Sequence, residues 1–396
     1  MILNTKTNNN YEVKIEKIVA NGYGLAFAEG LTIFVSLAAV GDVVRIRIIK
    51  KTGKVAFAEI VEVIEPSTFR VEPKCKYFGR CGGCDFQQMS DEAQLAAKLS
   101  ILQDCLKRIG KINFPTEIPI HASPKTFEYR TRTRLTADTR TNKLGFFRRN
   151  SNEVFDIDEC LILSDKLQKN LTELRETLNY EELWASNVEV EMASGDTETS
   201  TFSDEILSET KAISSKFGEF NYWFNAKTFF QGNPNLIEKL IETAIGDANG
   251  DTAIELFCGV GLFSFPLAKR FKKLFAVESN ETSIEFAEKN AELARIENVE
   301  FTAQDTSEFF DEFAVQTVNF ILVDPPRTGV ERSVLDAIIS FNPQQISYVS
   351  CDPATLARDL KILVENGYEI ETIEAFDLFP QTHHVETVAK LRLQVN

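Results

Sequence analysis

Two residues near the C-terminal end of the chain have the chemistry of a nucleophile and a base. Cys351 ends an apolar stretch and runs directly into Asp352-Pro353 and a predicted helix, in "YVSCDPATLARDL". Glu386 opens an apolar, alternating run in "FPQTHHVETVAKL". A thiolate can add to an electrophilic ring carbon, and a carboxylate can later remove a proton from the adduct. Taken singly, such a cysteine is more often a small buried residue and such a glutamate a solvated charge, so the chemistry depends on the surrounding elements.

A second set of residues indicates a nucleoside cofactor. In "AIELFCGVGLFSFPLA" a predicted strand, a turn with Gly259 and Gly261, and a helix follow one another, so the backbone can approach a ligand closely. Ser264 stands where a dinucleotide fingerprint has its third glycine, which disfavours a bound pyrophosphate. Glu278 ends the next strand, where it can accept hydrogen bonds from ribose hydroxyls, and Asp305 follows the third strand, within reach of an adenine amino group. A nucleoside without pyrophosphate predicts S-adenosylmethionine.

The loop "DPPRTG", which starts at Asp324, follows the fourth predicted strand. Its prolines stop the strand and fix a rigid loop, as in methyltransferases that hold a nucleobase edge-on. Amino-methylating enzymes usually have an aromatic residue where this chain has Arg327, and RNA cytosine-5 methyltransferases can have a cysteine in place of Pro326. Cys351, at the end of the fifth strand, is therefore the candidate nucleophile. Its addition to carbon 6 of uracil would activate carbon 5 for methylation, and Glu386 would remove the carbon-5 proton.

Four of the seven cysteines form a third pattern. Cys75, Cys81 and Cys84 lie in "CKYFGRCGGC", and Cys160 ends "FDIDEC". The chain has no apolar run of about 18 residues and no signal-peptide pattern, so we expect a cytoplasmic protein, not bound to a membrane, whose cysteines are ligands or catalysts. Four cysteines are compatible with zinc. The cysteine spacing of radical S-adenosylmethionine enzymes is not matched, which disfavours a radical mechanism.

The elements that must position these residues fall into three predicted domains. Residues 1–66 alternate apolar and polar residues between glycine turns, which predicts a small antiparallel β-barrel. Residues 67–225 contain the cysteine-rich loop, a helix over 91–109 with Ser90 as its N-cap, and a mixed α/β region. Residues 226–396 alternate helices with apolar strands, which predicts a doubly wound parallel sheet. Its strands are expected at 253–257, 273–277, 298–302, 318–323 and 345–350.

Charge is distributed unevenly along the chain. The net charge is −16, yet residues 1–150 have 24 Lys or Arg against 15 Asp or Glu, a net of +9, and the remainder has a net of −25. The densest basic block, residues 121–150, includes "YRTRTRL" and "GFFRRN". Arginines that alternate with aromatic residues suit phosphate contacts and base stacking, so RNA is an expected partner. An edge strand with solvated arginines is an equally good explanation of this block on charge alone.

The motifs "YVSCDPATLARDL", "DPPRTG", "ELFCGVG", "FFQGN" and "FPQTHHVE" together resemble the RNA uracil-5-methyltransferase family over nearly the whole chain. The resemblance implies an α/β fold: a Rossmann-like S-adenosylmethionine-dependent methyltransferase domain, preceded by an OB-like β-barrel of the TRAM type and a mixed α/β central iron–sulfur domain. It implies Cys351 as nucleophile and Glu386 as general base. It also implies cofactor contacts from Gln231, Phe257, Glu278 and Asp324, with Leu262 and Asp305 as lesser candidates.

The resemblance also bears on the four cysteines. In the family, a Cys-x5-Cys-Gly-Gly-Cys run and a distant cysteine bind a [4Fe–4S] cluster, which favours iron–sulfur over zinc at Cys75, Cys81, Cys84 and Cys160. Two residues depart from the family pattern, because members commonly have Asn in place of Asp352 and some have Asn in place of Leu262. The second departure puts a side-chain contact from Leu262 in doubt. The early helix over 91–109 is expected, by the same resemblance, to pack on the catalytic domain.

The implied function is methylation of a specific uridine in RNA, flipped from its stack into the catalytic pocket. The barrel and the iron–sulfur motif favour 23S ribosomal RNA over transfer RNA. No obligate protein partner is implied, and we expect a monomer. Two other classes are weighed: a methyltransferase of DNA or protein, against which the barrel and the arginines argue, and a non-catalytic RNA-binding module, against which the intact Cys351 and Glu386 argue.

Overall fold

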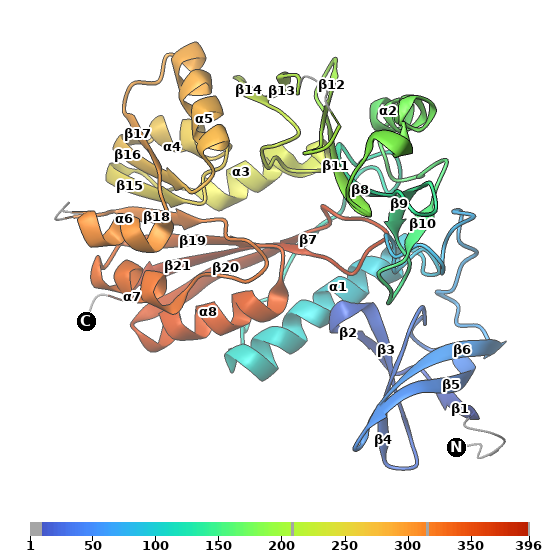
Figure 1. Cartoon of the computed structure of the whole chain (residues 1–396). Helices are drawn as coiled ribbons and strands as arrows, with labels where there is room; N and C mark the ends of the chain where they lie inside the picture. The colour runs from blue at the N-terminus through green and yellow to red at the C-terminus, as the bar shows by residue number, and fades with distance from the viewer. Residues whose placement is uncertain (1–9, 207–209, 314–316, 395–396) are drawn as a thin grey trace.

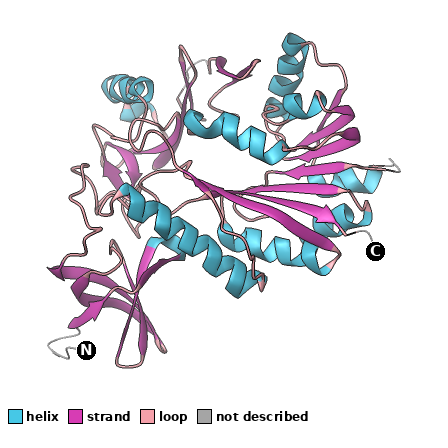
Figure 2. Ribbon diagram, turned by 180° about the vertical axis from the view of Figure 1, so that it is seen from behind, coloured by secondary structure: helices cyan, strands magenta, loops and turns pink. Residues whose placement is uncertain are grey.

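The computed structural model describes residues 10–206, 210–313 and 317–394. Figures 1 and 2 show three parts: an N-terminal β-domain, a smaller middle region of sheet and helix, and a large sheet lying between helices. Among the residues that the structure describes, no helix is both long enough and apolar enough to cross a membrane. The mixed α/β architecture predicted from the sequence is confirmed, with a β-rich domain at the N-terminal end.

The N-terminal domain is a six-stranded sheet in the order β1-β5-β6-β4-β3-β2. Its side chains alternate as a half-buried sheet requires: Ile33 and Val35 are fully buried, whereas Phe34 between them is only partly covered. β4 and β6 are parallel, whereas their neighbours pair antiparallel, so the prediction of a wholly antiparallel barrel is wrong at this pair. The strands are β1 (Asn10–Lys14), β2 (Lys17–Val19), β3 (Tyr23–Ala28), β4 (Leu31–Val35), β5 (Val43–Thr52) and β6 (Val55–Glu65).

Helix α1 (Asp91–Cys105) links the N-terminal part of the chain to the large sheet. It begins at the predicted cap, because the Ser90 hydroxyl accepts a hydrogen bond from the backbone N–H of Ala93. It continues into one π-helical turn, η2 (Leu106–Gly110). Its apolar side chains belong to the same core as those of α8 (Pro353–Glu365), far along the sequence. Figure 1 shows α1 between the N-terminal domain and α8.

The middle region is a five-stranded sheet in the order β10-β9-β8-β11-β12, covered by α2 (Asp165–Thr177). Its strands are β8 (Arg132–Asp138), β9 (Lys143–Phe147), β10 (Val154–Asp156), β11 (Asn187–Ser194) and β12 (Thr199–Phe202). The arginine-bearing β8 lies at the centre of this sheet, so the edge-strand explanation of the basic block is wrong for that strand. A separate hairpin, β13 (Ile213–Phe217) and β14 (Phe220–Phe224), leads into the large sheet.

The large sheet has eight strands in the order β17-β16-β15-β18-β19-β21-β20-β7. The five strands predicted from the sequence are present and parallel: β15 (Gly250–Leu256), β16 (Phe271–Glu278), β17 (Val299–Ala303), β18 (Phe320–Val323) and β19 (Gln345–Ser350). β21 (Glu386–Leu393) enters antiparallel between β19 and β20 (Tyr368–Phe376). The two-residue strand β7 (Ile120–His121) extends the sheet from the middle region.

Apolar residues on both faces explain why the central strands are buried. Along β18, Ile321 and Val323 belong to the core shared with α1, α7 and α8, whereas Phe320 and Leu322 belong to the core on the other face. This two-sided burial is the pattern of a doubly wound sheet. The remaining helices are α3 (Ile237–Ile245), α4 (Ser264–Ala268), α5 (Glu281–Ala294), α6 (Thr306–Glu312) and α7 (Arg332–Ser340).

Candidate active site

The carboxyl ends of the parallel strands bring the candidate residues to one edge of the sheet. Phe257 follows β15, Asp324 follows β18 and Cys351 follows β19, and β15, β18 and β19 are neighbours. Glu278 is the last residue of β16, on the other side of β15. In doubly wound sheets this edge is where ligands bind. The sequence-predicted catalytic and cofactor residues on these strands are therefore gathered at one place.

Cys351 and Glu386 are brought together by strand pairing. The antiparallel register of β19 and β21 pairs Ser350 with Thr387, so the next facing pair is Cys351 and Glu386. The Glu386 side chain is only 3 % exposed, whereas Cys351 is partly accessible. Burial and the nearby Glu386 carboxylate raise the pKa of Cys351 to about 12. The thiol is therefore protonated at neutral pH before substrate arrives.

Glu386 shares this site with a second acid. Burial, and secondarily the charge of Asp324, raise the pKa of Glu386 well above its usual range. Burial also raises the pKa of Asp324. A carboxyl group whose pKa is raised by burial holds a proton more strongly than a solvated one, which suits it to proton transfer. Arg327 is a positively charged residue near Cys351 and Glu386, and its charge lowers the pKa of each of them.

Two histidines, His383 and His384, come shortly before Glu386 in the sequence. The guanidinium of Arg327 lies 3.2 Å from Nε2 of His384. Burial lowers the pKa of His384 to about 3, so its ring is neutral and Nε2 accepts the hydrogen bond from Arg327. The His383 ring packs on the His384 ring at 4.1 Å between centroids. Both histidines lie in the motif "FPQTHHVE", and the sequence alone assigns neither a role.

The cofactor end of the sheet has the turn that the glycines predict. Phe257, Gly259 and Gly261 all have positive φ, at 63°, 55° and 94°. A Cβ at Gly261 would come within 2.8 Å of the Phe265 ring, so this position admits only glycine. Glu278 Oε2 accepts a hydrogen bond from the Gly259 backbone N–H at 3.2 Å, which ties the carboxylate to the turn.

The other cofactor candidates lie in different surroundings. Asp305 is exposed and caps α6, where its carboxylate accepts hydrogen bonds from the backbone and side chain of Ser307. Leu262 is buried in the apolar core, and its carbonyl accepts the Tyr222 hydroxyl at 3.1 Å. Gln231 lies, together with Phe230, in a broad cleft lined by the middle region, the β13–β14 hairpin and the segment before α3.

Sequence analysis missed Glu255, a buried acid one residue before the end of β15. One of its oxygens accepts a hydrogen bond from Ser264, the residue that replaces the third glycine. The other, Oε1, is buried without a partner. Burial raises the pKa of Glu255 to about 8. The signal was present in "AIELF", since a charged residue in an otherwise apolar strand is rarely buried without a function.

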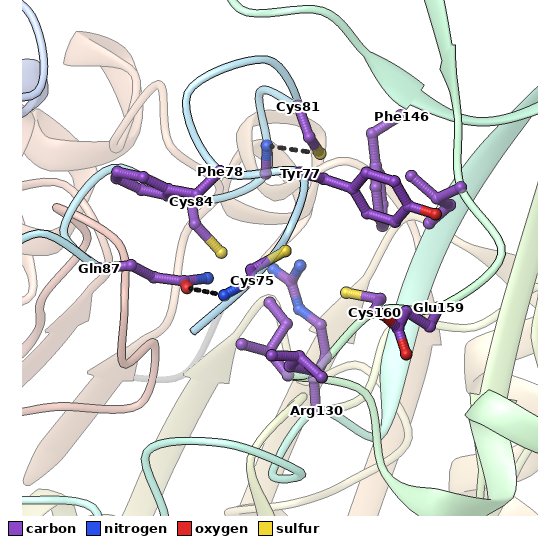
Figure 3. A pocket seen from close by; sticks show the side chains of 14 residues that line it. Cys75, Tyr77, Phe78, Cys81, Cys84, Gln87, Arg130, Phe146, Glu159 and Cys160 are labelled. Carbon is purple, nitrogen blue, oxygen red and sulfur yellow. Dashed lines mark hydrogen bonds between the residues drawn. The ribbon is translucent and has the colours of Figure 1, made fainter. Parts of the chain in front are cut away.

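The four predicted metal-binding cysteines line one small cavity of about 30 Å³ (Figure 3). Cys75, Cys81 and Cys84 come from the loop before α1, and Cys160 comes from the segment after β10. The backbone N–H of Cys75 donates to Gln87 Oε1, and that of Gly83 donates to the Cys81 sulfur. Among the described residues, no group of three or more His, Cys, Asp or Glu side chains has an arrangement that could hold a single metal ion.

Besides the four cysteines, the cavity is lined mostly by apolar and aromatic side chains, with Gln87, Arg130 and Glu159 as its polar members. Burial raises the pKa of Cys84 to about 12 and of Cys160 to about 11. Thiols are the donor type that an iron–sulfur cluster or zinc binds as thiolates, but these four are not arranged in the structure as they would be around a single metal ion.

Most arginines of the basic block make ion pairs within the protein. On β8, Arg132 and Arg134 both pair with Glu191 of β11. Arg148 pairs with Glu153, and Arg149 pairs with Asp85 beside the cysteines. The block therefore stabilises the middle region as well as presenting positive charge, a role that charge counting did not predict.

The fold and the strand-end site define an S-adenosylmethionine-dependent methyltransferase of the Rossmann-like class. Residues 161–393 match the model of the tRNA (uracil-5-)-methyltransferase family. The chain belongs to this family of RNA (uracil-5-)-methyltransferases.

Relatives match along nearly their whole length. An RNA methyltransferase of Aquifex aeolicus is 30% identical, over 97% of this chain and 98% of its own. A 23S rRNA (uracil(1939)-C(5))-methyltransferase of Marinomonas sp. is 33% identical, over 96% and 94%. The crystal structure of Pyrococcus abyssi tRNA (uracil-54, C5)-methyltransferase with S-adenosyl-L-homocysteine is similar, with a TM-score of 0.75 and 26% identity, over 96% of this chain and 100% of that one.

Proposed function

We propose that this enzyme methylates carbon 5 of one uridine in RNA through a covalent adduct, with Cys351 as nucleophile and Glu386 as general base. The observation that carries the proposal is the facing position of these two residues across β19 and β21, at the edge where the cofactor turn also lies. Their burial supports it further, because it raises the pKa of the Cys351 thiol and of the Glu386 carboxyl beside it.

The Cys351 thiol releases its proton to solvent, its sulfur bonds to carbon 6, and the electrons of the 5,6 double bond move toward carbon 5 and the adjacent carbonyl oxygen. S-adenosylmethionine would supply the methyl group that carbon 5 takes and would leave as S-adenosylhomocysteine. Glu386 then accepts the proton from carbon 5, the 5,6 double bond re-forms, and the carbon–sulfur bond to Cys351 breaks. Arg327 is suited to favour the thiolate and the negative charge that develops on the ring.

The cofactor contacts are proposed for residues at the same edge. Glu278 would exchange its hydrogen bond with Gly259 for the ribose hydroxyls, and Phe257 and Asp324 would flank the methionine part. Asp305 would approach the adenine, and Gln231 would reach the cofactor from the segment before α3, in which the Phe229 carbonyl lies near Gly259. For Leu262, the backbone is the better candidate, because its side chain is in the core.

We propose 23S ribosomal RNA as the substrate, with transfer RNA as the alternative. The similarity to proteins named 23S rRNA (uracil(1939)-C(5))-methyltransferase supports the first, and the transfer RNA enzyme of Pyrococcus abyssi supports the second. The N-terminal domain, residues 1–66, would bind RNA as a TRAM-type barrel. Its outer face supports this role, because Tyr23, Phe34 and Phe57 form a partly exposed aromatic cluster opposite Lys50.

We propose residues 226–396 as the catalytic domain. The middle region, residues 67–225, is proposed to hold a [4Fe–4S] cluster at Cys75, Cys81, Cys84 and Cys160. Support comes from the convergence of all four cysteines on one cavity. We test it in Cys84→Ser, with Cys105→Ser as the matched control. Cys84→Ser should lose bound iron, labile sulfide and visible absorption, and Cys105→Ser should keep them. Stoichiometric zinc in anaerobically purified wild-type enzyme would contradict the cluster.

The main experiment is nucleoside mass spectrometry of ribosomal and transfer RNA from cells with and without the gene. Loss of 5-methyluridine from one RNA pool, restored by the wild-type gene and not by Cys351→Ala, would support the reaction and identify its substrate. Unchanged 5-methyluridine in both pools, in cells without a second such enzyme, would contradict the proposal. We propose further that the enzyme works in the cytoplasm as a monomer.

A further inference from the structure

The segment that leads into Glu386 is held by parts of the chain far from it in sequence. We name residues 377–384, between β20 and β21, the base turn, and residues 75–87 the cysteine loop. In Figure 1 the base turn is the red segment that reaches from the large sheet toward the middle region. Gln381 has a positive φ of 68°, so the turn needs outside contacts to keep this shape.

The first half of the base turn is fixed through its backbone. The Gln381 carbonyl accepts hydrogen bonds from the N–H groups of Asp85 and Phe86, at 2.9 and 3.0 Å. The side chains of Gln381 and Gln94 are 3.0 Å apart in a hydrogen bond, and Gln94 also accepts the Gln381 backbone N–H. The Tyr129 hydroxyl donates to the Pro380 carbonyl at 3.0 Å.

The second half of the turn is held through the side chains of its two histidines. Nδ1 of His383 lies 2.6 Å from Oδ2 of Asp85, and because a carboxylate only accepts, Nδ1 carries the proton. Asp85 directly follows Cys84, and its other oxygen accepts a hydrogen bond from Arg149 at 2.9 Å. His383 packs on His384, which in turn accepts the hydrogen bond from Arg327 beside Cys351.

We propose that Asp85 and His383 are positioning residues for the proton-removal step. Their hydrogen bond joins the cysteine loop to the last residues before Glu386 and so fixes where the Glu386 carboxylate lies. This inference rests on the proposed role of Glu386 as general base. It gives the cysteine loop a function in catalysis that needs no electron transfer, because the loop acts as the support of the base turn.

The rate of proton removal depends strongly on where the Glu386 carboxylate lies. Glu386 must approach a single carbon-bound proton of an adduct held by Cys351, and a displacement of about 1 Å can lower such a rate about 100-fold. Earlier steps depend less on Glu386, because sulfur attack on carbon 6 and methyl transfer to carbon 5 do not use its carboxylate. Loss of the Asp85–His383 contact should therefore slow release of the adduct more than its formation.

Two variants separate the effect of the His383–Asp85 hydrogen bond from the effect of the His383 ring. His383→Phe keeps a ring against His384 and removes the Nδ1 donor, whereas His383→Asn keeps a donor at nearly the same place. We expect His383→Phe to lower kcat about tenfold with KM for RNA and cofactor within about twofold. The fraction of enzyme caught as covalent RNA adduct, measured on denaturing gels at steady state, should rise toward that of Glu386→Gln. His383→Asn should restore both values in part.

The matched control is the other carboxylate–histidine contact, Glu374 with His121, at 2.7 Å. Glu374→Gln should leave kcat and the adduct fraction at wild-type values. If His383→Phe fails to fold, Asp85→Asn takes its place. Asp85→Asn should likewise lower kcat and raise the adduct fraction. Wild-type kcat and adduct fraction in a folded His383→Phe would overturn the inference while leaving the proposed function intact. Absence of adduct in Glu386→Gln would overturn both, which distinguishes the two failures.

Discussion

Cys351 and Glu386 face each other at the first residue pair beyond the paired ends of β19 and β21. The antiparallel insertion of β21 creates this relationship, because it places the start of one strand beside the carboxyl end of another. A wholly parallel sheet would put the two residues at opposite edges. The late reversal of strand direction therefore brings a base to the edge where the nucleophile lies.

Substitutions at the two residues should have different effects on the adduct. Cys351→Ala should abolish both methylation and the covalent complex, because no sulfur remains to attack carbon 6. Glu386→Gln should lower turnover by about 100-fold or more yet let adduct accumulate, since the carbon-5 proton remains. Denaturing gels with labelled RNA measure this, with Cys105→Ala as a buried-thiol control expected to behave as wild type. Adduct in Cys351→Ala would show that another residue is the nucleophile.

The activity should increase with pH. The pKa of Cys351 is raised to about 12 and that of Glu386 is also raised, so both reactive forms, thiolate and carboxylate, become more populated as pH rises. We expect the Cys351 thiolate alone to increase kcat/KM by about tenfold per pH unit between about pH 6 and about pH 9, with a steeper rise where Glu386 also ionises.

Replacing Arg327 tests the cause of that dependence. Arg327 lowers the pKa of both Cys351 and Glu386, so Arg327→Gln should move the pH profile to higher pH and reduce activity at neutral pH. Arg332→Gln, which removes an exposed arginine of α7 from its pair with Asp336, is the control and should leave the profile in place. An unchanged profile in Arg327→Gln would show that its charge does not act on the nucleophile or the base.

The buried ion pair between Lys98 of α1 and Asp377 of the base turn predicts a large effect on stability. Both side chains are almost inaccessible, at 0% and 6% exposure, and Lys98 also donates to the Phe379 carbonyl at 3.0 Å. Lys98→Met leaves Asp377 buried without its partner, which should cost about 3–5 kcal/mol in the free energy of unfolding. Urea unfolding measures the loss.

An exposed pair supplies the control for that measurement. Lys361→Met removes the partner of Glu365 on α8 and should change the unfolding free energy by less than about 1 kcal/mol. The double variant Lys98→Met with Asp377→Leu should regain much of the loss, since neither charge is then left buried alone. Equal stability of Lys98→Met and wild type would mean that Asp377 is solvated or neutral in the folded protein.

The sequence predicted the residues of the site better than the contacts that hold them. Strand ends could be located because apolar runs stop at Asp324 and Cys351, and period-two alternation marked Glu386 as the start of a strand. Lys98 could not be predicted as buried, because a lysine on a helix normally faces water and its partner lies 279 positions away. The contact between Asp85 and His383 was missed for the same reason, as it depends on how two distant loops pack.

The outer face of the N-terminal sheet is predicted to bind RNA through its aromatic residues. The rings of Phe34 and Phe57 lie 5.4 Å apart on paired strands, and the register places Lys50 opposite Phe57. Bases that stack there would each contribute about 1–3 kcal/mol, so Phe57→Ala should weaken RNA binding by about tenfold or more. The kcat at saturating RNA should stay unchanged, because Phe57 belongs to β6 of the N-terminal sheet and not to the strands of the large sheet whose ends form the proposed site. Trp184→Ala, which removes an aromatic residue that is 85% exposed on the middle region, is the control and should bind RNA as the wild type does. Equal RNA affinity in Phe57→Ala and Trp184→Ala would contradict a role of this face in binding.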